Sequence, residues 1–357
     1  MSVAPEKSHA ELLRHMRPLV RGRPDATIAL ARQFAAAGEM QAAIDLANDA
    51  FAAAPGDGEV RALSSELLGQ SVPDWHFVIT RDQVRNQAYA NALARAVKAD
   101  NLVLEIGTGS GILAMMAARS GARVVTCEAN PAIASAARAV IAANGLSDRI
   151  TVISTHSTEL DLASDLGRRA DILVSEIVSN DLLSEGVLPA HADAASRLLK
   201  PGAQVIPARG RVRAALAHDA HPARRIMNSD SGFDLSAFNR LARAQYEIRI
   251  ADPRLALRSE PVDLFTFAFD GSHHMGDGRT VVELASGGGV VNGIVQWIAL
   301  DMDDVGKYEN SPGPNNSSCW ATLFWPLAQP LATRPGEVIR VGGYHTQERV
   351  RMWRIAE

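Results

Sequence analysis

Cysteine is nearly absent from this sequence, which has only Cys127 and Cys319 among its 357 residues. Two cysteines so far apart supply neither a disulfide framework nor the paired spacing of a zinc site. We therefore expect no disulfide scaffold and no metal.

The sequence also lacks a long apolar run and a large excess of either charge. No uninterrupted apolar stretch reaches the roughly 18 residues of a membrane span, and the N-terminal residues carry no apolar signal core. These absences predict a cytoplasmic protein without a membrane partner. The net charge of −4 and the pI of about 6.2 argue against a nucleic-acid partner, because a protein that coats nucleic acid should be basic. The same charge and pI do not exclude a substrate that is itself basic.

The composition that is present is that of an ordinary folded chain. Hydrophobic residues make up 47% of the sequence and charged residues 21%, which excludes global disorder. The length fits two or three domains better than one.

The N-terminal segment, residues 1–70, has the pattern of short antiparallel helices. Pro24 begins one helix, Gly38 follows its end, and Pro55 follows the end of a second, with a third expected over Glu59–Leu68. Helix pairs with short turns and alanines at the contacts resemble a tetratricopeptide repeat of about 34 residues; an ordinary helical cap is the alternative. Because one and a half repeats cannot stand alone, we expect the module to pack on the next domain.

Residues 71–208 alternate between apolar runs and helical patterns, which predicts a doubly wound parallel sheet. A helix is expected over residues 84–97. The next strands and helices are expected at Leu102–Ile106, Ile112–Arg119, Val124–Cys127, Ala132–Ala143, Ile150–Ile153 and Ile172–Val174.

Residues 209–357 lose the helical pattern and are predicted to form an antiparallel β domain, a sandwich or a barrel. One helix is expected near Asp234–Tyr246, and Gly287–Gly289 is expected to form a turn. The strand candidates are Arg211–Leu216, Val262–Phe269, Thr280–Glu283 and Gly293–Leu300. The predicted fold class is therefore α/β: a Rossmann-like domain between a small helical module and a β domain.

A glycine-rich loop, GTGSGI, follows the first predicted strand. Gly107, Gly109 and Gly111 remove side chains where the backbone must turn sharply or approach a ligand. The third glycine comes one residue earlier than in the dinucleotide pattern G-x-G-x-x-G. With the acidic Glu105 just before the loop, this spacing favours S-adenosylmethionine. The loop would then contact the amino-acid part and the ribose, since that cofactor has no phosphate.

Glu128 ends the second predicted strand, 17 residues after Gly111. A carboxylate there can accept hydrogen bonds from both ribose hydroxyls; a solvated strand-end acid is the alternative. An NAD-dependent dehydrogenase also remains open, and binding of S-adenosylhomocysteine or of NAD would separate the two.

The segment SEIVSNDLLSEGVLP, residues 175–189, carries the substrate signal. It follows the fourth predicted strand, at the edge of the sheet where ligands bind. Glu176 and Glu185 flank a short loop that can bring them together, and paired carboxylates bind a guanidinium through bidentate hydrogen bonds. Two solvated loop acids are the alternative. The segment resembles the double-glutamate loop of the protein arginine methyltransferases.

The resemblance extends from Asp74 to the C-terminus. The segment DWHFVITRDQVRNQAY resembles the part of the family that folds over the cofactor, and HSTEL resembles its adenine-contacting segment. The resemblance implies that Arg85 binds the cofactor carboxylate with His76 nearby. The implied adenine contacts are Ser157, Thr158 and Glu159.

The chain departs from the family in its substrate pocket. Where the family has Thr-His-Trp, this sequence reads SSCWATLFWPL, so Cys319 replaces the histidine and Trp320 is kept. Asp82, which corresponds to the acid that pairs with that histidine, should therefore lack its usual partner. We expect Cys319 to be a buried thiol rather than a reactive one.

The resemblance implies an S-adenosylmethionine-dependent enzyme that methylates a guanidino nitrogen of arginine in a protein or peptide. The loop sequences HSTEL and SNDLLSEGVLP most resemble those of the subgroup that makes only monomethylarginine. The family further implies a C-terminal β-barrel, a dimerisation arm near residues 222–245 and hence a homodimer, and the helical module suggests a protein partner. Two alternatives remain: a methyltransferase for a small guanidino compound or other metabolite, and a non-catalytic scaffold that binds the cofactor.

Overall fold

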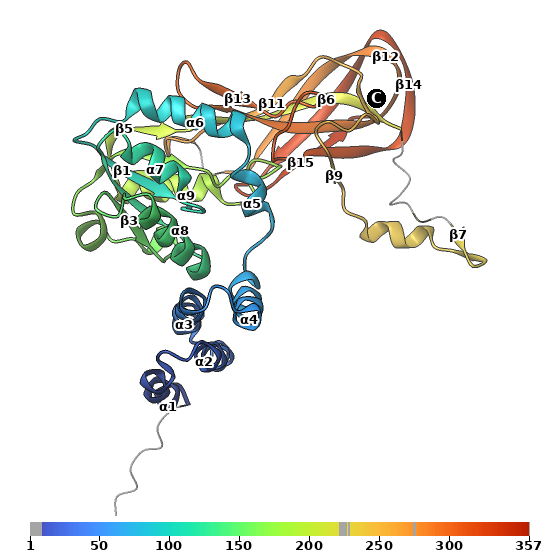
Figure 1. The fold of residues 1–357 in the computed structure, drawn as a ribbon. Coiled ribbons are helices and arrows are strands. Elements are labelled where there is room, and N and C mark those ends of the chain that lie inside the picture. Colours follow the sequence, from blue (N-terminus) through green and yellow to red (C-terminus); the bar gives the residue numbers. More distant parts are fainter. Residues whose placement is uncertain (1–8, 221–226, 228, 274–275, 357) are drawn as a thin grey trace, which may run out of the picture.

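The computed structural model describes residues 9–220, 227, 229–273 and 276–356. Figure 1 shows three regions along the chain: a stack of N-terminal helices, a layered α/β region and a strongly twisted β region. No helix in the described ranges is long and apolar enough to cross a membrane.

The N-terminal helices form a small unit with its own apolar core. The unit comprises α1 (His9–Met16), η1 (Arg17–Val20), α2 (Pro24–Ala36), α3 (Met40–Ala53) and α4 (Gly58–Gly69). The core is built around Phe34, Ile28 and Leu46. As expected, the unit docks on the next region: α3 packs on α8, where the Asn48 side-chain amide donates to the Ser135 hydroxyl over 2.8 Å. Its identity as a tetratricopeptide repeat stays a prediction.

The α/β region contains a five-stranded parallel sheet of order β3-β2-β1-β4-β5. All five residues of β1 are buried, as the apolar sequence LVLEI requires of a central parallel strand. Because the strand order reverses between β1 and β4, a crevice opens at their carboxyl ends. The strands are β1 (Leu102–Ile106), β2 (Arg123–Cys127), β3 (Ile150–Ile153), β4 (Ala170–Ser175) and β5 (Leu199–Ile206). The helices are α5 (Trp75–Ile79), α6 (Gln83–Ala96), α7 (Ile112–Ala118), α8 (Pro131–Ala143) and α9 (Val187–Arg197).

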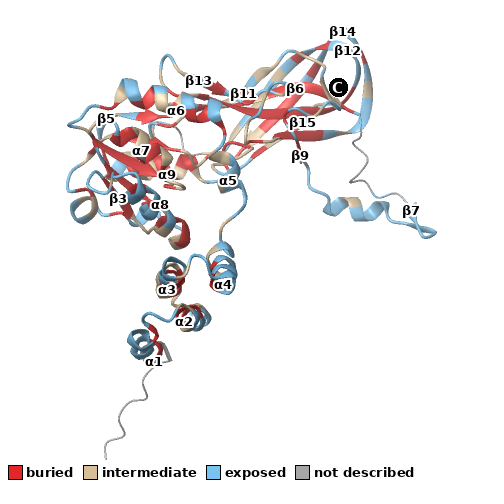
Figure 2. Ribbon diagram, in the orientation of Figure 1, coloured by how far each residue is buried: buried red, intermediate tan, exposed pale blue. Residues whose placement is uncertain are grey.

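The β region is an eight-stranded antiparallel sheet of order β10-β6-β12-β14-β15, with β11 on β6, β13 on β12 and β9 on β14. In Figure 2 much of β6 is buried, whereas the far ends of β12 and β14 are more exposed. The antiparallel domain is confirmed, and its closure into a barrel stays a prediction. The strands are β6 (Arg209–Asp219), β9 (Tyr246–Ile248), β10 (Leu255–Leu257), β11 (Val262–Ala268), β12 (Gly278–Asp301), β13 (Lys307–Glu309), β14 (Thr322–His345) and β15 (Val350–Arg354).

The expected turn at Gly287–Gly289 is wrong, because this segment lies inside the long strand β12. The strand continues through it with a register shift between Ala285 and Gly287. Gly288 and Gly289 both have φ of +90°, so the glycines accommodate a bulge rather than a reversal. A Cβ at Gly288 would lie 2.9 Å from Pro335 Cδ on the paired strand, which leaves room only for glycine.

The helix expected near Asp234–Tyr246 is reduced to the 3-10 turn η5 (Ser236–Leu241), which follows a small hairpin of β7 (Ser229–Asp230) and β8 (Phe233–Asp234). Helices draw most of their stability from a packed apolar face, and here Phe238 is 59% and Leu241 74% exposed. In Figure 1 this arm extends away from the rest of the molecule. Residues 222–226 and 228 of the expected arm lie outside the described residues.

Candidate active site

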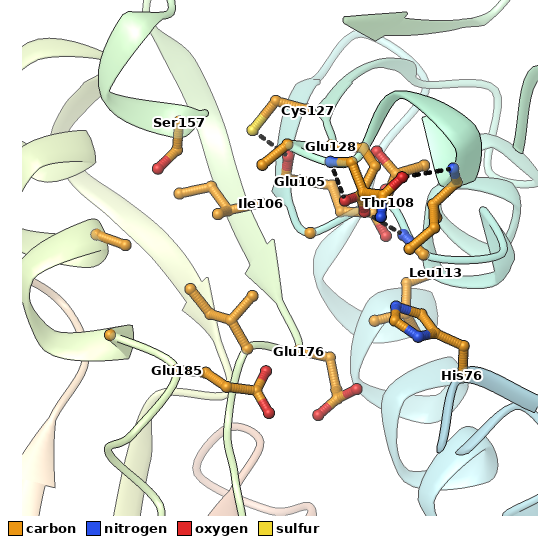
Figure 3. Close-up of a pocket in the computed structure, with 18 of the residues that line it drawn as sticks. His76, Glu105, Ile106, Thr108, Leu113, Cys127, Glu128, Ser157, Glu176 and Glu185 are labelled. Carbon is orange, nitrogen blue, oxygen red and sulfur yellow. Dashed lines mark hydrogen bonds between the residues drawn. The ribbon is translucent and has the colours of Figure 1, made fainter. Parts of the chain in front are cut away.

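A cavity of about 580 Å³ lies at the carboxyl ends of β1, β2 and β4. Figure 3 shows the glycine loop and Glu128 on one side, the Glu176 and Glu185 carboxylates on another, and His76 from α5 nearby. The sequence-predicted residues from distant segments therefore meet at the strand-order switch point.

The glycine loop holds its shape through positive φ angles. Gly107, Gly109 and Gly111 have φ of +85°, +51° and +80°, a region that disfavours other residues. A Cβ at Gly107 would lie 2.7 Å from Ile177 Cγ2, so this glycine also allows the β4 loop to approach. Gly107 and Gly109 line the cavity, whereas Gly111 does not and instead precedes α7.

Glu128 is fixed by two backbone N–H groups. Its Oε2 accepts from Gly109 N over 3.1 Å, and its Oε1 accepts from Asn130 N over 2.9 Å. Each carboxylate oxygen keeps a further lone pair. The carboxylate is thus oriented and can still accept two hydroxyl groups, as a ribose would require.

Glu105 lies beneath the loop, fully buried, and its two carboxylate oxygens find no hydrogen-bond partner within the part of the chain that the structure describes. Burial raises the pKa of this carboxyl to about 8. A buried, unpartnered acid that lines a cavity is a fitting site for a cationic ligand group. The amino-acid end of S-adenosylmethionine carries such a group, so the residues present fit this cofactor.

The adenine segment is only partly placed as expected. Ser157 and Thr158 line the cavity, together with Thr155 and His156, which the sequence did not single out. Glu159 does not line it, because its carboxylate accepts a hydrogen bond from the Thr155 hydroxyl.

The short helix α5 covers one side of the cavity. His76 lines it, with its ring stacked on Trp75 at a centroid distance of 3.7 Å and Nδ1 at 3.0 Å from Pro73 O. Trp75 was not identified from the sequence. Its position after a Pro-Asp turn was the available signal.

Arg85 forms a buried ion pair with Glu176, with 2.8 Å between Nη2 and Oε2. The sequence expectation was a cofactor carboxylate for Arg85, which also lines the cavity. Arg85 Nε and Glu176 Oε1 are buried without a partner among the described residues. Each group therefore keeps one polar atom for a ligand.

Glu176 and Glu185 point toward each other across a short gap (Figure 3). Burial raises the pKa of Glu176, the Arg85 guanidinium opposes the rise, and the Glu185 carboxylate adds to it. Loss of solvation and then the neighbouring Asp181 raise the pKa of Glu185 to about 7. Two acids whose charged forms are disfavoured in this way are poised to bind a cation.

A second cavity, of about 570 Å³, shares both glutamates with the first. Cys319 and Trp320 line it, as the sequence predicted for the substrate pocket. Trp320 Nε1 donates to Val178 O over 3.1 Å and so fixes the β4 loop against the β region. Burial raises the pKa of the Cys319 thiol, in agreement with an unreactive cysteine.

Asp82 lacks the histidine partner, as expected from Cys319, but other donors take its place. Its Oδ2 accepts from the Tyr308 hydroxyl and from Cys319 N, both over 3.0 Å. Its Oδ1 caps α6 by accepting from Arg85 N over 2.9 Å. Asp82 is 4% exposed and lines neither cavity, so it supports Arg85 rather than contacting a ligand. Tyr308 was missed because its segment carries no motif.

Comparisons with known proteins agree with this arrangement. The sequence model of the ribosomal protein L11 methyltransferase (PrmA) family matches residues 87–208. An arginine N(omega)-methyltransferase from Streptomyces achromogenes subsp. streptozoticus is 38% identical over 278 residues, which cover 77% of each chain. Protein arginine N-methyltransferase 7 of Drosophila melanogaster is 32% identical over 269 residues; the match covers 69% of this chain and only 38% of that protein.

Two solved structures share the fold. A Trypanosoma brucei PRMT1 enzyme-prozyme heterotetrameric complex with AdoHcy has a TM-score of 0.68 at 20% identity, over 79% of this chain and 98% of that one. Arabidopsis thaliana protein arginine methyltransferase 10 has a TM-score of 0.63 at 18% identity, over 78% and 97%. With the identity to the Streptomyces protein and the paired glutamates of the site, this chain belongs to the arginine N-methyltransferase family.

Proposed function

We propose that this protein transfers a methyl group from S-adenosylmethionine to a guanidino nitrogen of arginine in a protein or peptide. The observation that supports this most directly is the pair Glu176 and Glu185, which stands where the two cavities meet. The first cavity would hold the cofactor and the second would admit the arginine side chain.

The cofactor supplies an electrophilic methyl group on a sulfonium. Glu128 would hold the ribose hydroxyls, and the glycine loop would let the backbone approach. Glu105 would face the cationic amino-acid end, and Arg85 would use its free Nε toward the carboxylate. These contacts would fix the methyl group in line with the arriving nitrogen, and such positioning can supply a large part of the rate enhancement of a displacement.

The paired carboxylates would orient the guanidinium and draw its positive charge toward the nitrogens that do not react. The attacking nitrogen then gains lone-pair density, forms the N–C bond as the S–C bond breaks, and releases a proton. Glu185, with its pKa of about 7, is suited to accept that proton.

The test replaces each glutamate by glutamine, which keeps the shape and removes the charge. Glu185→Gln should lower kcat by at least about 100-fold while the affinity for S-adenosylhomocysteine stays near that of the unaltered protein. Glu176→Gln should do the same and also destabilise the fold, by about 3–5 kcal/mol, because it leaves Arg85 buried without its counter-charge.

Methylation is measured by mass spectrometry of peptides, affinity by calorimetry and stability by urea denaturation. Glu283→Gln, on the exposed face of β12, is the matched control. Near-normal turnover of Glu185→Gln would rule out the paired-glutamate assignment.

A small guanidino compound is the second candidate substrate. It is favoured by the name of the Streptomyces relative, which specifies arginine without a protein, and by two cationic side chains in the second cavity, Arg349 and Arg351. Parallel assays with proteins, peptides and free guanidino compounds separate the two.

The proposed product is monomethylarginine, because the loop sequences resemble the monomethylating subgroup. Ile79 lines both cavities, whereas Val187 is buried and lines neither. Cys319 is smaller than a histidine, and the added space could admit a methylated guanidinium. Substantial dimethylarginine at early time points would contradict the assignment.

We also propose a cytoplasmic homodimer, held by the arm that carries Phe233, Phe238 and Leu241. These side chains are 70%, 59% and 74% exposed, more than a projecting arm would leave uncovered without a partner. The helical module, residues 1–70, would serve recognition, residues 71–208 cofactor binding and residues 209–357 substrate binding.

A further inference from the structure

The second cavity is lined by both acidic and cationic side chains. Glu176 and Glu185 line it from the β4 loop. Arg349 and Arg351 line it from the β region: Arg349 lies in the turn between β14 and β15, and Arg351 lies on β15. A cavity with separated charges of opposite sign favours a ligand that carries both charges in the reverse arrangement.

Neither of these arginines forms an ion pair with a carboxylate in the ranges that the structure describes. Arg351 Nη1 donates only to Val350 O, over 2.8 Å, and Arg349 is exposed. Arg211 and Arg213, which lie on β6, are different, because each pairs with two carboxylates. The guanidinium groups in the cavity therefore keep most of their donors for a ligand.

The backbone that carries these side chains is well defined. His345 pairs with Val350 across the hairpin. Thr346 N donates to Arg349 O over 2.9 Å, and Arg349 N donates to the Thr346 hydroxyl over 3.1 Å. A fixed turn reduces the entropy lost when the side chains close on a ligand.

We propose that Arg349 and Arg351 bind the α-carboxylate of the substrate arginine while Glu176 and Glu185 bind its guanidinium. The substrate class is then an arginine with a free carboxylate: the amino acid itself or the C-terminal residue of a peptide. This inference rests on the proposed methyl transfer to a guanidino nitrogen, and it narrows the substrate from any protein or peptide arginine to an arginine with a free α-carboxylate. Arginine and carboxylate form planar, bidentate and charge-assisted hydrogen bonds, which suit this recognition.

The same charges disfavour other arginines. An arginine inside a peptide chain has no α-carboxylate, so its entry would leave two cations without compensation. A neighbouring arginine or lysine in such a peptide would also be repelled. Two further acids line the cavity, Asp181 and Glu247, but Asp181 accepts hydrogen bonds within its own loop and Glu247 accepts one from Asn180.

The experiment compares substrates that differ only in the carboxylate. Agmatine is arginine without that group, and peptides ending in arginine can be made as the acid or as the amide. With the full chain and S-adenosylmethionine, kcat/KM should be at least about tenfold higher for L-arginine than for agmatine, or for the peptide acid than for its amide. A preference confined to one pair identifies the source of the carboxylate as the free amino acid or the chain end.

The protein arm uses Arg349→Gln and Arg351→Gln, singly and together. Each should reduce the ratio of kcat/KM for L-arginine to kcat/KM for agmatine, and in the double variant this ratio should fall to about one because kcat/KM for L-arginine falls far more than that for agmatine. Arg354→Gln is the control, since Arg354 is exposed on the same strand and lines neither cavity. If the two arginines only balanced the acids of the cavity, their replacement would lower kcat/KM for every substrate by the same factor. That result would overturn the proposal.

Equal kcat/KM values for L-arginine and agmatine, together with equal values for the peptide acid and its amide, would also overturn the proposal. Methylation of agmatine or of an internal peptide arginine would still support the methyltransferase function. Failure of every guanidino substrate would overturn both. Calorimetric titration of L-arginine and agmatine in the presence of S-adenosylhomocysteine gives the same comparison without turnover, and tighter binding of L-arginine is expected.

Discussion

At the scale of single residues, the acids of the site differ in their burial and in the hydrogen bonds that their carboxyl groups accept. Glu128 is oriented by two backbone N–H groups, whereas Glu105 has no such donors among the described residues and burial raises its pKa to about 8. Glu176 and Glu185 also have raised pKa values. Ligand cations would restore the charged forms, so cation binding and proton release should be coupled here.

This coupling predicts a pH dependence. Glu185 must be ionised to bind a guanidinium, and with a pKa of about 7 its ionised fraction rises from about one tenth at pH 6 to about nine tenths at pH 8. We therefore expect kcat/KM to rise with pH over this window and to fall below it. Initial rates in buffers of constant ionic strength test this. Glu185→Gln should flatten the residual profile, and a rate that falls from pH 6 to pH 8 would contradict the assignment.

Tyr308 is the residue whose role only the structure reveals. Its hydroxyl donates to Asp82, which caps the helix that positions Arg85. Tyr308→Phe should lower kcat several-fold and the free energy of unfolding by about 1–2 kcal/mol, because Asp82 loses a buried donor. Tyr344→Phe removes a surface hydroxyl and is the control. Unchanged turnover with an unchanged affinity for S-adenosylhomocysteine would show that Cys319 N alone suffices for Asp82.

At the scale of elements, the sequence predicted the parallel sheet closely and the β region poorly. β1 and β3 have the predicted bounds, since a buried parallel strand is a continuous apolar run between turn residues. In β12, burial alternates first and then becomes continuous, so its two halves read as separate strands. The pairing that joins them involves β14, more than 30 residues further along the chain, and local pattern cannot show it.

The site divides in the same way. The glycine loop and Glu128 belong to one local motif, so the sequence could place them at the first cavity. Arg349, Arg351 and Tyr308 reach the site through strand pairing in the β region, and no local spacing marks them. Long-range packing therefore accounts for what the sequence did not predict.

The glycine loop gives a prediction at this scale. Gly107→Ala places a Cβ 2.7 Å from Ile177 Cγ2 at a φ of +85°, so the loop or the neighbouring Glu176 segment must shift. We expect the affinity for S-adenosylhomocysteine to fall at least about tenfold. Gly313→Ala, where a Cβ meets no atom within 4 Å, is the control. Equal affinities for both variants, measured by calorimetry, would show that the loop tolerates the shift.

At the scale of the whole molecule, the helical module meets the enzyme region through few polar contacts. The Asn48 side chain donates to the Ser135 hydroxyl over 2.8 Å, whereas Ser71, whose carbonyl oxygen accepts from the Asn130 side chain, already belongs to the enzyme region. A protein beginning at Ser71 should therefore still bind S-adenosylhomocysteine, but it should lose solubility or activity on a large substrate. Asn48→Ala in the full chain is the milder control. A fully active, soluble truncated protein would count against a recognition role for the module.

The apolar core of the helical module is separate from the one beneath the active site, and this has a consequence for how the sequence can change. Phe34 belongs to the cluster in the helices and Tyr89 to the cluster beneath the catalytic site, and the two clusters share no residue. A substitution that loosens the helices should leave the enzyme region folded. Over evolution, the helical surface that does not pack on α8 can thus diverge to suit a new partner while the chemistry is conserved.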